Sequence, residues 1–374
     1  MQEGSPADPQ KNTRRFFMND KKQMAQLVIA GALIGVLAVL SVIKGNPGNM
    51  GICIACFIRD IAGGLGLHRA EVVQYIRPEI LGIILGAFGV SLFRKEFAPR
   101  VGSSPMLRFV IAFFMMIGAL VFLGCPTRMI LRLANGDLNA LFGLAGFACG
   151  VGVGIFFLNK GYSLKRAYKS SAAEGSLISL IQLVLLFLLL SGSGLLIFSA
   201  EGPGSMHTPI FWALGVGLAV GVCAQITRMC TAGSIRDIIM FRDFTLFSGI
   251  FATFVAALIL NLVLGKFNLG FEGQPVAHTD GLWNFLGMTL VGFGAILLGG
   301  CPLRQLILAG EGNIDSALTV IGLALGAAFA HNFKLASSPK GPTPGGQAAV
   351  IIGLILFAFI AFMHCRKESG FIKK

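Results

Sequence analysis

Long apolar runs constrain this chain more than any other feature of its sequence. About 20 apolar residues in a helix cross the hydrocarbon core of a bilayer, which is roughly 30 Å thick. Hydrophobic residues make up 55% of the chain and charged residues 13%, whereas soluble domains are about 25% charged. We therefore predict an all-α polytopic membrane protein with about ten spans, at residues 24–43, 78–93, 106–124, 138–158, 177–198, 207–225, 244–265, 282–300, 314–331 and 347–363.

The net charge of +13 follows the predicted topology. If the N-terminus lies inside, the inside segments carry 21 of the 30 Lys and Arg residues and the outside segments carry 9. This bias predicts that both termini are cytoplasmic. The positive charge therefore reflects topology, with a contribution from anionic lipid, and gives no support for nucleic-acid binding.

Two pairs of motifs recur in the two halves of the chain, in the same order. The run CIACFIRDI from Cys53 matches CTAGSIRDI from Cys230 at six of nine positions, and GCPTR from Gly124 matches GCPLR from Gly300. The motif cysteines are 72 residues apart in the first half and 71 in the second. Matching order and spacing predict a duplicated unit of four spans.

A connecting span between two four-span units inverts the second unit across the membrane. Inverted repeats with broken helices are characteristic of transporters, whose site lies near the bilayer midplane. No ATP-binding, zinc-protease or serine-hydrolase motif is present, so the architecture favours transport without a cofactor over enzyme chemistry. The predicted parts are a polar cytoplasmic tail at 1–23, a first transport repeat at 24–158, a basic loop and linker span at 159–206, a second, inverted repeat at 207–331, and a last span with a basic cytoplasmic tail at 332–374.

The GCPxR motifs combine a soft sulfur with a positive charge. Proline suits the first position of a helix, so Cys125 and Cys301 are predicted to stand at or beside the N-caps of short helices. Helix N-termini suit anions, and Arg128 and Arg304 lie about one turn further on, on the same side as the cysteine. The alternative is a structural helix break with a packed cysteine and a snorkelling arginine.

The C-x4-IRD motifs are rich in small residues, as expected for re-entrant half-helices that line a cavity. Neighbouring residues point about 100° apart on a helix, so we expect Arg59 and Asp60, and likewise Arg236 and Asp237, to bind partners elsewhere rather than each other. Two roles remain open for these residues. The aspartates form structural ion pairs that lock the half-helices together, or the arginines contact the substrate directly.

The sequence also contains a CxxC at Cys53 and Cys56, a spacing typical of redox proteins. Cys56 matches Gly233 in the second half, whereas Cys53 matches Cys230, so the repeated feature is one cysteine per motif and Cys56 is a secondary thiol. The histidines show neither repeat partners nor ligand spacing, so no metal site is predicted. They are His68, His207, His278, His331 and His364.

Paired GCPxR and C-x4-IRD motifs in a ten-span chain resemble the YeeE/YedE family of membrane proteins. The likeness is strongest to its YedE branch, described as selenium transporters, and covers residues 24–363. The resemblance implies a bacterial inner-membrane protein that takes up a small sulfur- or selenium-containing anion, such as thiosulfate, guided by a line of cysteines. Carried over, these are Cys125 and Cys301, with Cys53 and Cys230 beside them. The partners would be the anion, the lipid bilayer and a cytoplasmic sulfur-carrier protein.

A competing hypothesis uses the same cysteines for chemistry instead of transport. In it the chain is a membrane thiol–disulfide carrier or a sulfur- or selenium-transfer enzyme, and the CxxC motivates that interpretation. A structural membrane subunit is a further alternative.

Overall fold

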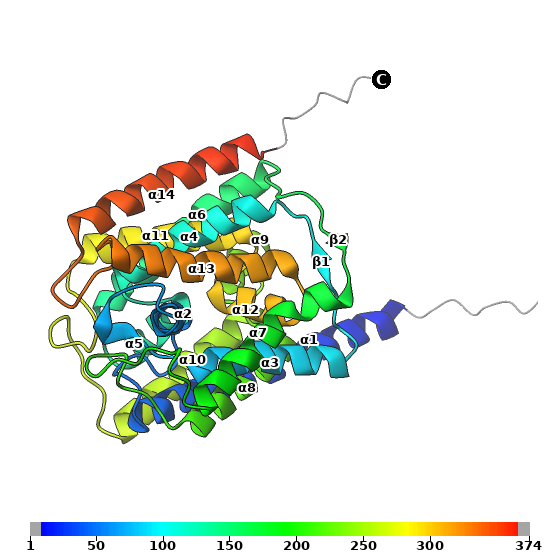
Figure 1. The fold of residues 1–374 in the computed structure, drawn as a ribbon. Coiled ribbons are helices and arrows are strands. Elements are labelled where there is room, and N and C mark those ends of the chain that lie inside the picture. The colour runs from blue at the N-terminus through cyan, green and yellow to red at the C-terminus, as the bar shows by residue number, and fades with distance from the viewer. Residues whose placement is uncertain (1–8, 366–374) are drawn as a thin grey trace, which may run out of the picture.

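The computed structural model describes residues 9–365 of the chain, with side chains described from residue 21 onward. Residues 1–8 and 366–374, which hold the ends of both predicted tails, lie outside the described residues. Helices dominate the fold (Figure 1). The α-helices are α1 (Pro9–Ile43), α2 (Ile54–Gly64), α3 (Pro78–Phe93), α4 (Pro105–Phe122), α5 (Pro126–Ala134), α6 (Asn139–Asn159), α7 (Ala172–Leu190), α8 (Ile210–Thr227), α9 (Thr231–Phe241), α10 (Thr245–Val263), α11 (Gly281–Leu298), α12 (Pro302–Gly310), α13 (Ile314–Asn332) and α14 (Pro344–Met363).

Little regular structure lies outside these helices. A single 3-10 turn, η1 (Glu71–Val73), precedes α3. The strands β1 (Arg100–Val101) and β2 (Tyr168–Lys169) pair antiparallel at one end of the molecule. The start of α1 and the end of α14 point toward that same end (Figure 1).

Ten segments of the described chain are long and apolar enough to cross a membrane, which confirms the number of predicted spans. The predicted span 78–93 coincides with α3, whereas the last span is longer than predicted because α14 begins at Pro344. Three segments contain a break and continue as a short helix. They are Pro105–Ala134, Ile210–Phe241 and Gly281–Gly310.

The predicted span 177–198 is wrong in its boundaries. Its helix, α7, begins at Ala172 after the N-cap Ser171 and ends at Leu190, eight residues before the predicted end. The chain leaves the helix at a Ser-Gly-Ser-Gly run, where Gly192 has φ +63°. Hydropathy extended the span because apolar residues follow this run, but they lie in a loop, where Ile197 N–H donates to Gly64 O at the end of α2.

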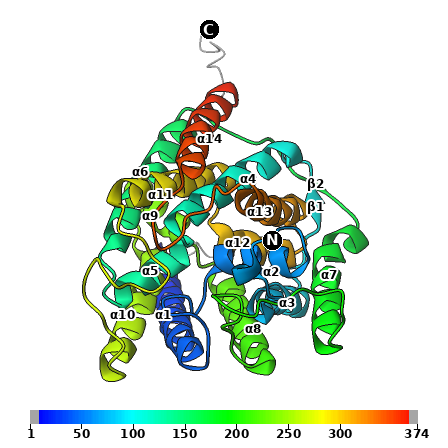
Figure 2. The same ribbon diagram turned by 60° about the vertical axis from the view of Figure 1, so that its left-hand side comes forward.

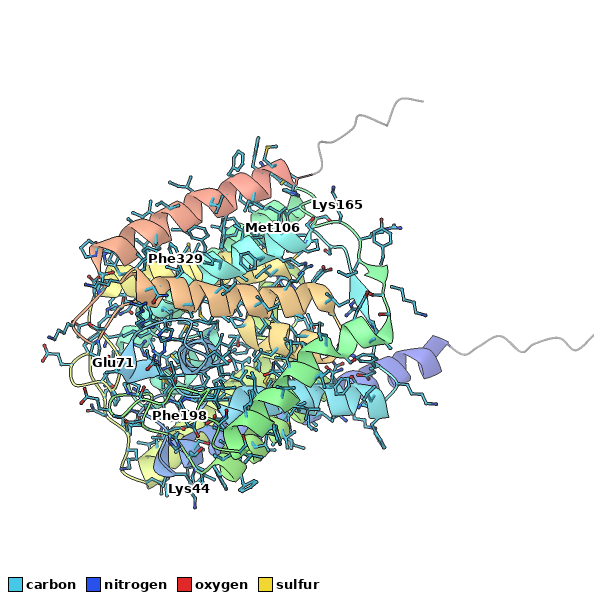
Figure 3. The ribbon with its side chains drawn as sticks, viewed as in Figure 1. Lys44, Glu71, Met106, Lys165, Phe198 and Phe329 are labelled. Atoms are coloured by element: carbon cyan, nitrogen blue, oxygen red, sulfur yellow. The ribbon has the colours of Figure 1, made fainter. Side chains whose placement is uncertain are left out.

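Apolar side chains cover the outside of the bundle. Met106 is 72% exposed and Phe329 39% exposed, and both lie along the sides of the molecule, whereas Lys44 and Lys165 lie at opposite ends (Figure 3). A soluble protein rarely exposes a contiguous apolar surface of this extent. Together with the ten apolar segments, this distribution shows a multi-pass membrane protein.

The short helices lie between two groups of long helices. In Figure 2, α2, α5 and α12 are enclosed by α4, α6, α11, α13 and α14 above and by α1, α3, α7, α8 and α10 below. The main packing pairs are α1 with α10, α3 with α8, α4 with α13, and α6 with α11. Helices α1, α3, α4 and α6 of the first predicted repeat correspond to α8, α10, α11 and α13 of the second. Exchanging the repeats therefore converts the α1–α10 pair into the α3–α8 pair, and the α4–α13 pair into the α6–α11 pair. This pattern supports a two-fold relation between the halves, while the inversion across the membrane stays a prediction.

Glycines allow these helix pairs to approach closely. A Cβ at Gly146 or Gly150 of α6 would overlap carbonyl oxygens of α11, at Phe285 and Thr289 respectively. Close contact of this kind lets helices pack by van der Waals forces where lipid gives no hydrophobic drive. These two glycines therefore allow α6 and α11 to pack closely.

We expect Gly150→Ala to lower the free energy of unfolding by about 1–3 kcal/mol, because the added methyl group has no room against Thr289 O. Gly152→Ala is the matched control on the same helix, since nothing lies within 4 Å of a Cβ there. Thermal unfolding of the purified protein in detergent measures both. Equal melting temperatures for the two variants would contradict the packing described for α6 and α11.

Candidate functional site

Four short helices begin inside the bundle, each directly after a motif cysteine. Helices α2 and α9 have 11 residues, and α5 and α12 have 9, so each is about 14–17 Å long and too short to cross a bilayer. The N-cap residues are Cys53, Cys125, Cys230 and Cys301. For Cys125 and Cys301 this position, with proline following, confirms the helix start predicted from GCPxR.

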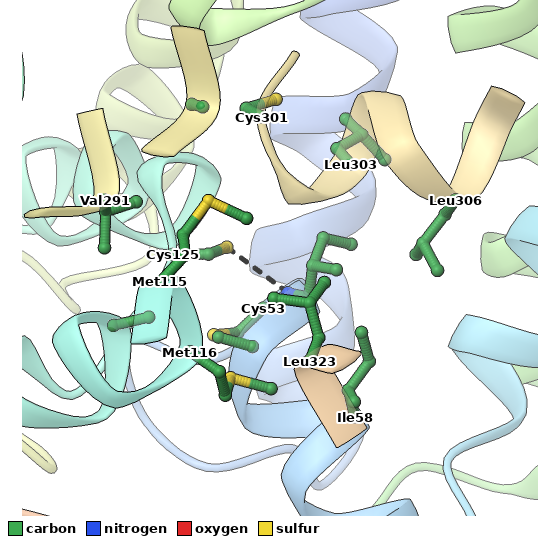
Figure 4. Close-up of a cluster of buried hydrophobic side chains, with 14 of the residues drawn as sticks. Cys53, Ile58, Met115, Met116, Cys125, Val291, Cys301, Leu303, Leu306 and Leu323 are labelled. Atoms are coloured by element: carbon green, nitrogen blue, oxygen red, sulfur yellow. Dashed lines mark hydrogen bonds between the residues drawn. The ribbon is translucent and has the colours of Figure 1, made fainter. Parts of the chain in front are cut away.

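In the first half, the sulfur atoms of the two motif cysteines accept backbone hydrogen bonds at the start of α2. Cys53 Sγ accepts from Cys56 N–H at 3.3 Å, and Cys125 Sγ accepts from Ile54 N–H at 3.3 Å. Figure 4 shows Cys53 and Cys125 side by side, with the second bond as a dashed line. The two motifs of the first half therefore meet at their cysteines.

The second half repeats this meeting with a different pattern of bonds. Cys230 Sγ accepts from Gly233 N–H at 3.3 Å, within its own helix, and from Cys301 N–H at 3.4 Å. Each cysteine pair thus lies where the positive ends of two helix dipoles converge. Such convergence suits an anion.

All four motif cysteines belong to one buried cluster and are at most 6% exposed. Cys301 lies in the same region as Cys53 and Cys125 in Figure 4, with the thioethers of Met115 and Met116 nearby. A cavity of about 10 Å³, with room for about one water molecule, is lined by residues of both halves, among them Thr127, Thr231 and Leu303.

The guanidinium group of Arg128 contacts Cys56 rather than Cys125. Arg128 is fully buried and donates to Asn49 O at 2.9 Å, to Val276 O at 3.1 Å, to Leu123 O and to Cys56 Sγ at 3.3 Å. Cys56, which has no repeat counterpart, is therefore a direct neighbour of a motif arginine. Arg304 has a different environment, since its Nη1 atom is buried and has no hydrogen-bond partner.

The prediction that Arg59 and Asp60 do not pair is wrong. Arg59 Nη2 lies 2.7 Å from Asp60 Oδ1 and Nε donates to the same oxygen at 2.9 Å. The two side chains diverge where they leave the helix, but the long arginine side chain turns back to the carboxylate. Asp60 also binds Arg77 Nε at 2.7 Å, so it ties α2 to the start of α3 as well.

Arg236 and Asp237 also pair with each other, at 2.8 Å, again contrary to the prediction. Their side chains are 35% and 13% exposed, whereas those of Arg59 and Asp60 are 3% and 0% exposed. Among the described residues, neither takes part in a further ion pair. The two IRD motifs are thus alike in sequence and different in environment.

The sequence analysis missed four buried charged residues of the first half, namely Arg77, Glu79, Arg132 and Asp137. Arg77, besides its pair with Asp60, donates to Pro203 O at 2.7 Å and to Met206 O at 3.0 Å. Arg132 Nε binds Asp137 Oδ2 at 2.6 Å, with both side chains fully buried. The available signal was charge at the edge of an apolar span. Arg77 lies directly before Pro78 and Arg132 lies four residues after Arg128, so both fall at membrane depth.

Positive charge exceeds negative charge in the buried part of the first half. The fully or nearly fully buried ionisable side chains there are four arginines and three carboxylates, namely Arg59, Arg77, Arg128, Arg132, Asp60, Glu79 and Asp137. With the helix N-termini, this excess favours an anion over a cation. The part of the chain that the structure describes holds no group of three or more His, Cys, Asp and Glu side chains placed to bind a metal ion.

Comparison with known proteins yields two matches. A family model described as Sulphur transport matches residues 2–153 and 226–365, so each matched part contains one pair of cysteine motifs. The chain is also 29% identical over 118 residues to the thiosulfate transporter TsuA of Spirochaeta thermophila. That match covers 32% of this chain and 35% of the relative, about a third of the relative's length.

We expect Asp60→Asn to lower the free energy of unfolding by about 3–5 kcal/mol, because it leaves two buried guanidinium groups without their carboxylate. Asp237→Asn is the matched control at the equivalent position, where partial exposure limits the loss to about 1 kcal/mol or less. Chemical or thermal unfolding in detergent compares the two. A larger loss for Asp237→Asn would show that the network around Asp60 does not stabilise the fold.

Proposed function

This chain belongs to the sulphur transport family, the YeeE/YedE proteins, and from that premise we propose that it is a transporter for a small sulfur- or selenium-containing anion. The observation that carries the proposal is the meeting of four half-helices, each begun by a buried cysteine. We propose that Cys125 and Cys301, with Cys53 and Cys230 beside them, form the path for the anion.

The chemistry of this junction suits a soft anion. Helix N-termini attract negative charge, and a thiol is only a weak hydrogen-bond donor. A polarisable anion such as thiosulfate, which carries a terminal sulfur, matches these groups better than sulfate, which holds its water strongly. Weak binding at several successive sites also lets the anion leave, as conduction requires.

The proposed topology follows the inverted repeat. The first pair of motifs is reached from outside the cell and the second from the cytoplasm, in a bacterial inner membrane with both termini cytoplasmic. The common direction of the start of α1 and the end of α14 supports this arrangement (Figure 1). Because the four motif cysteines are at most 6% exposed, the half-helices must separate during each passage. A sulfur-carrier protein is the proposed cytoplasmic acceptor.

A thiol-based reaction is the second candidate function. The observation that favours it is the contact between Cys56 Sγ and the Arg128 guanidinium group, 3.3 Å apart, because a cation beside a thiol promotes redox and nucleophilic chemistry. In this alternative Cys53 and Cys56 would carry a disulfide or a bound sulfur or selenium atom.

We expect Cys125→Ala and Cys301→Ala each to reduce uptake of labelled thiosulfate into proteoliposomes by about tenfold or more, since a lost hydrogen bond to a charged group costs about 1.5–3 kcal/mol. Cys149→Ala is the control, because Cys149 is an exposed residue of α6. Undiminished uptake in both single variants and in the double variant would exclude the cysteine path.

Serine replacements extend this experiment to the alternative function. A transporter that uses its thiols only for hydrogen bonding keeps part of its uptake in Cys53→Ser and Cys56→Ser, because a hydroxyl group also donates and accepts. A thiol carrier loses all turnover in these variants, and its wild type yields a trapped mixed disulfide or persulfide.

Competition identifies the substrate class. We expect excess unlabelled thiosulfate and selenide to suppress uptake of labelled thiosulfate, because both present a soft chalcogen atom to the cysteines. Sulfate at the same concentration should leave uptake unchanged. Competition by sulfate equal to that by thiosulfate would show that the path selects for charge alone.

A further inference from the structure

The two arginines of the GCPxR motifs are equivalent in sequence but bind different partners. Every nitrogen of the Arg128 guanidinium group has a hydrogen-bond acceptor, and three of the four acceptors are backbone carbonyl oxygens, at Asn49, Leu123 and Val276. Its side chain is 0% exposed. Four of the five N–H groups of Arg128 can thus be assigned to acceptors within the protein, and each of its three guanidinium nitrogens is engaged.

The partners of Arg128 show what it does. Leu123 is the C-cap of α4, with φ 62°, and its carbonyl lies beyond the last turn, where no helical N–H reaches it. Arg128 Nη1 donates to this carbonyl, and Arg132 Nη1 donates to Phe122 O at 2.9 Å. Two fully buried cations thus satisfy the broken end of α4.

In the second half the neutral side chain of Gln305 donates to backbone carbonyls at the corresponding helix break. Gln305 Nε2 donates to Leu298 O at 3.2 Å and to Gly300 O at 3.3 Å, at the broken end of α11. Gln305 is fully buried and stands where the first repeat has Met129. Arg108 Nη1 adds a bond to Leu298 O at 3.1 Å. The carbonyls of Leu298 and Gly300 therefore have donors other than Arg304.

Arg304 is left with a buried guanidinium nitrogen that has no partner. Its Nη1 atom has no hydrogen bond, and within the described residues no carboxylate lies in ion-pair range of its side chain. Glu311 is the C-cap of the same helix, α12. Glu311 is already held by Arg228 Nη1 at 2.6 Å and by Arg100 Nη2 at 3.3 Å.

Arg304 lies one turn after Cys301, the N-cap of α12, and Cys301 N–H donates to Cys230 Sγ, the sulfur of the N-cap of α9. Arg304 is partly buried, an unpaired cation in such a place is costly, and an anion would offset that cost through charge-assisted hydrogen bonds. The starts of two helices and a guanidinium nitrogen without a partner are thus available in the second half, whereas every guanidinium nitrogen of Arg128 already has an acceptor.

We propose that Arg304 is the anion-binding arginine, that Arg128 is a structural cap of α4, and that Gln305 frees Arg304 for its role. This inference rests on the proposed function and makes it more specific. It places the charged binding step of transport in the second repeat, next to Cys230 and Cys301, for a small anion with a soft sulfur or selenium atom.

The test is thiosulfate binding to the full-length protein in detergent, followed with labelled thiosulfate, beside thermal unfolding. Arg304→Gln should weaken binding by about 10- to 100-fold with little change in melting temperature, because Arg304 caps no backbone group. Arg128→Gln should lower the melting temperature. Arg304→Lys should restore part of the affinity, because it keeps the charge and loses the planar fork.

Gln305→Met provides a second, independent variant that leaves both arginines in place. It gives the second repeat the residue found at the equivalent position of the first, so Arg304 should turn to the carbonyls of α11 and binding should weaken. Wild-type affinity in both Arg304→Gln and Gln305→Met would overturn the inference. Failure of the wild-type protein to bind or transport thiosulfate and selenide would instead reject the proposed function.

Discussion

A helix broken inside a lipid-facing bundle leaves backbone N–H and C=O groups beyond the reach of water, and each unpaired group costs on the order of a few kcal/mol. This constraint explains the unusual side chains around the breaks. Cysteine sulfur atoms accept the N–H groups at the starts of the half-helices, as Cys125 does for Ile54 and Cys230 does for Cys301. Arginine and glutamine side chains donate to the carbonyls where the preceding helices end.

The two halves meet the same constraint with different residues. Arg128 and Arg132 cap α4, whereas Gln305 and Arg108 cap α11. An arginine can bind a ligand only where backbone carbonyls do not already accept from its N–H groups. The difference between Met129 and Gln305, directly after the motif arginine, therefore decides whether that arginine caps the helix or is available to a ligand. Repetition in sequence therefore produced two similar sites with unequal chemistry.

Predictions from local chemistry succeeded, and predictions that depended on side-chain partners failed. Proline after Cys125 and Cys301 indicated the helix starts, because its missing N–H costs nothing there. The ten spans followed from apolar length. The expectation that Arg59 and Asp60 stay apart failed, because helical angles describe where side chains leave the backbone and not where a long side chain ends. Hydropathy also missed the end of α7, since it averages over the short Ser-Gly run that stops the helix.

The sequence by itself determined that the chain is a helical membrane protein with ten spans, and where its motif helices begin, because apolar length and proline act through neighbouring residues. Only the tertiary structure decided which thiols meet and which cations are occupied. Arg128 takes an acceptor 79 residues before it and another 148 residues after it, and Cys125 meets a helix start 71 residues away. Hydrogen-bond partners so distant along the chain are set by packing, and packing decided that Arg304 alone of the two motif arginines keeps a free nitrogen.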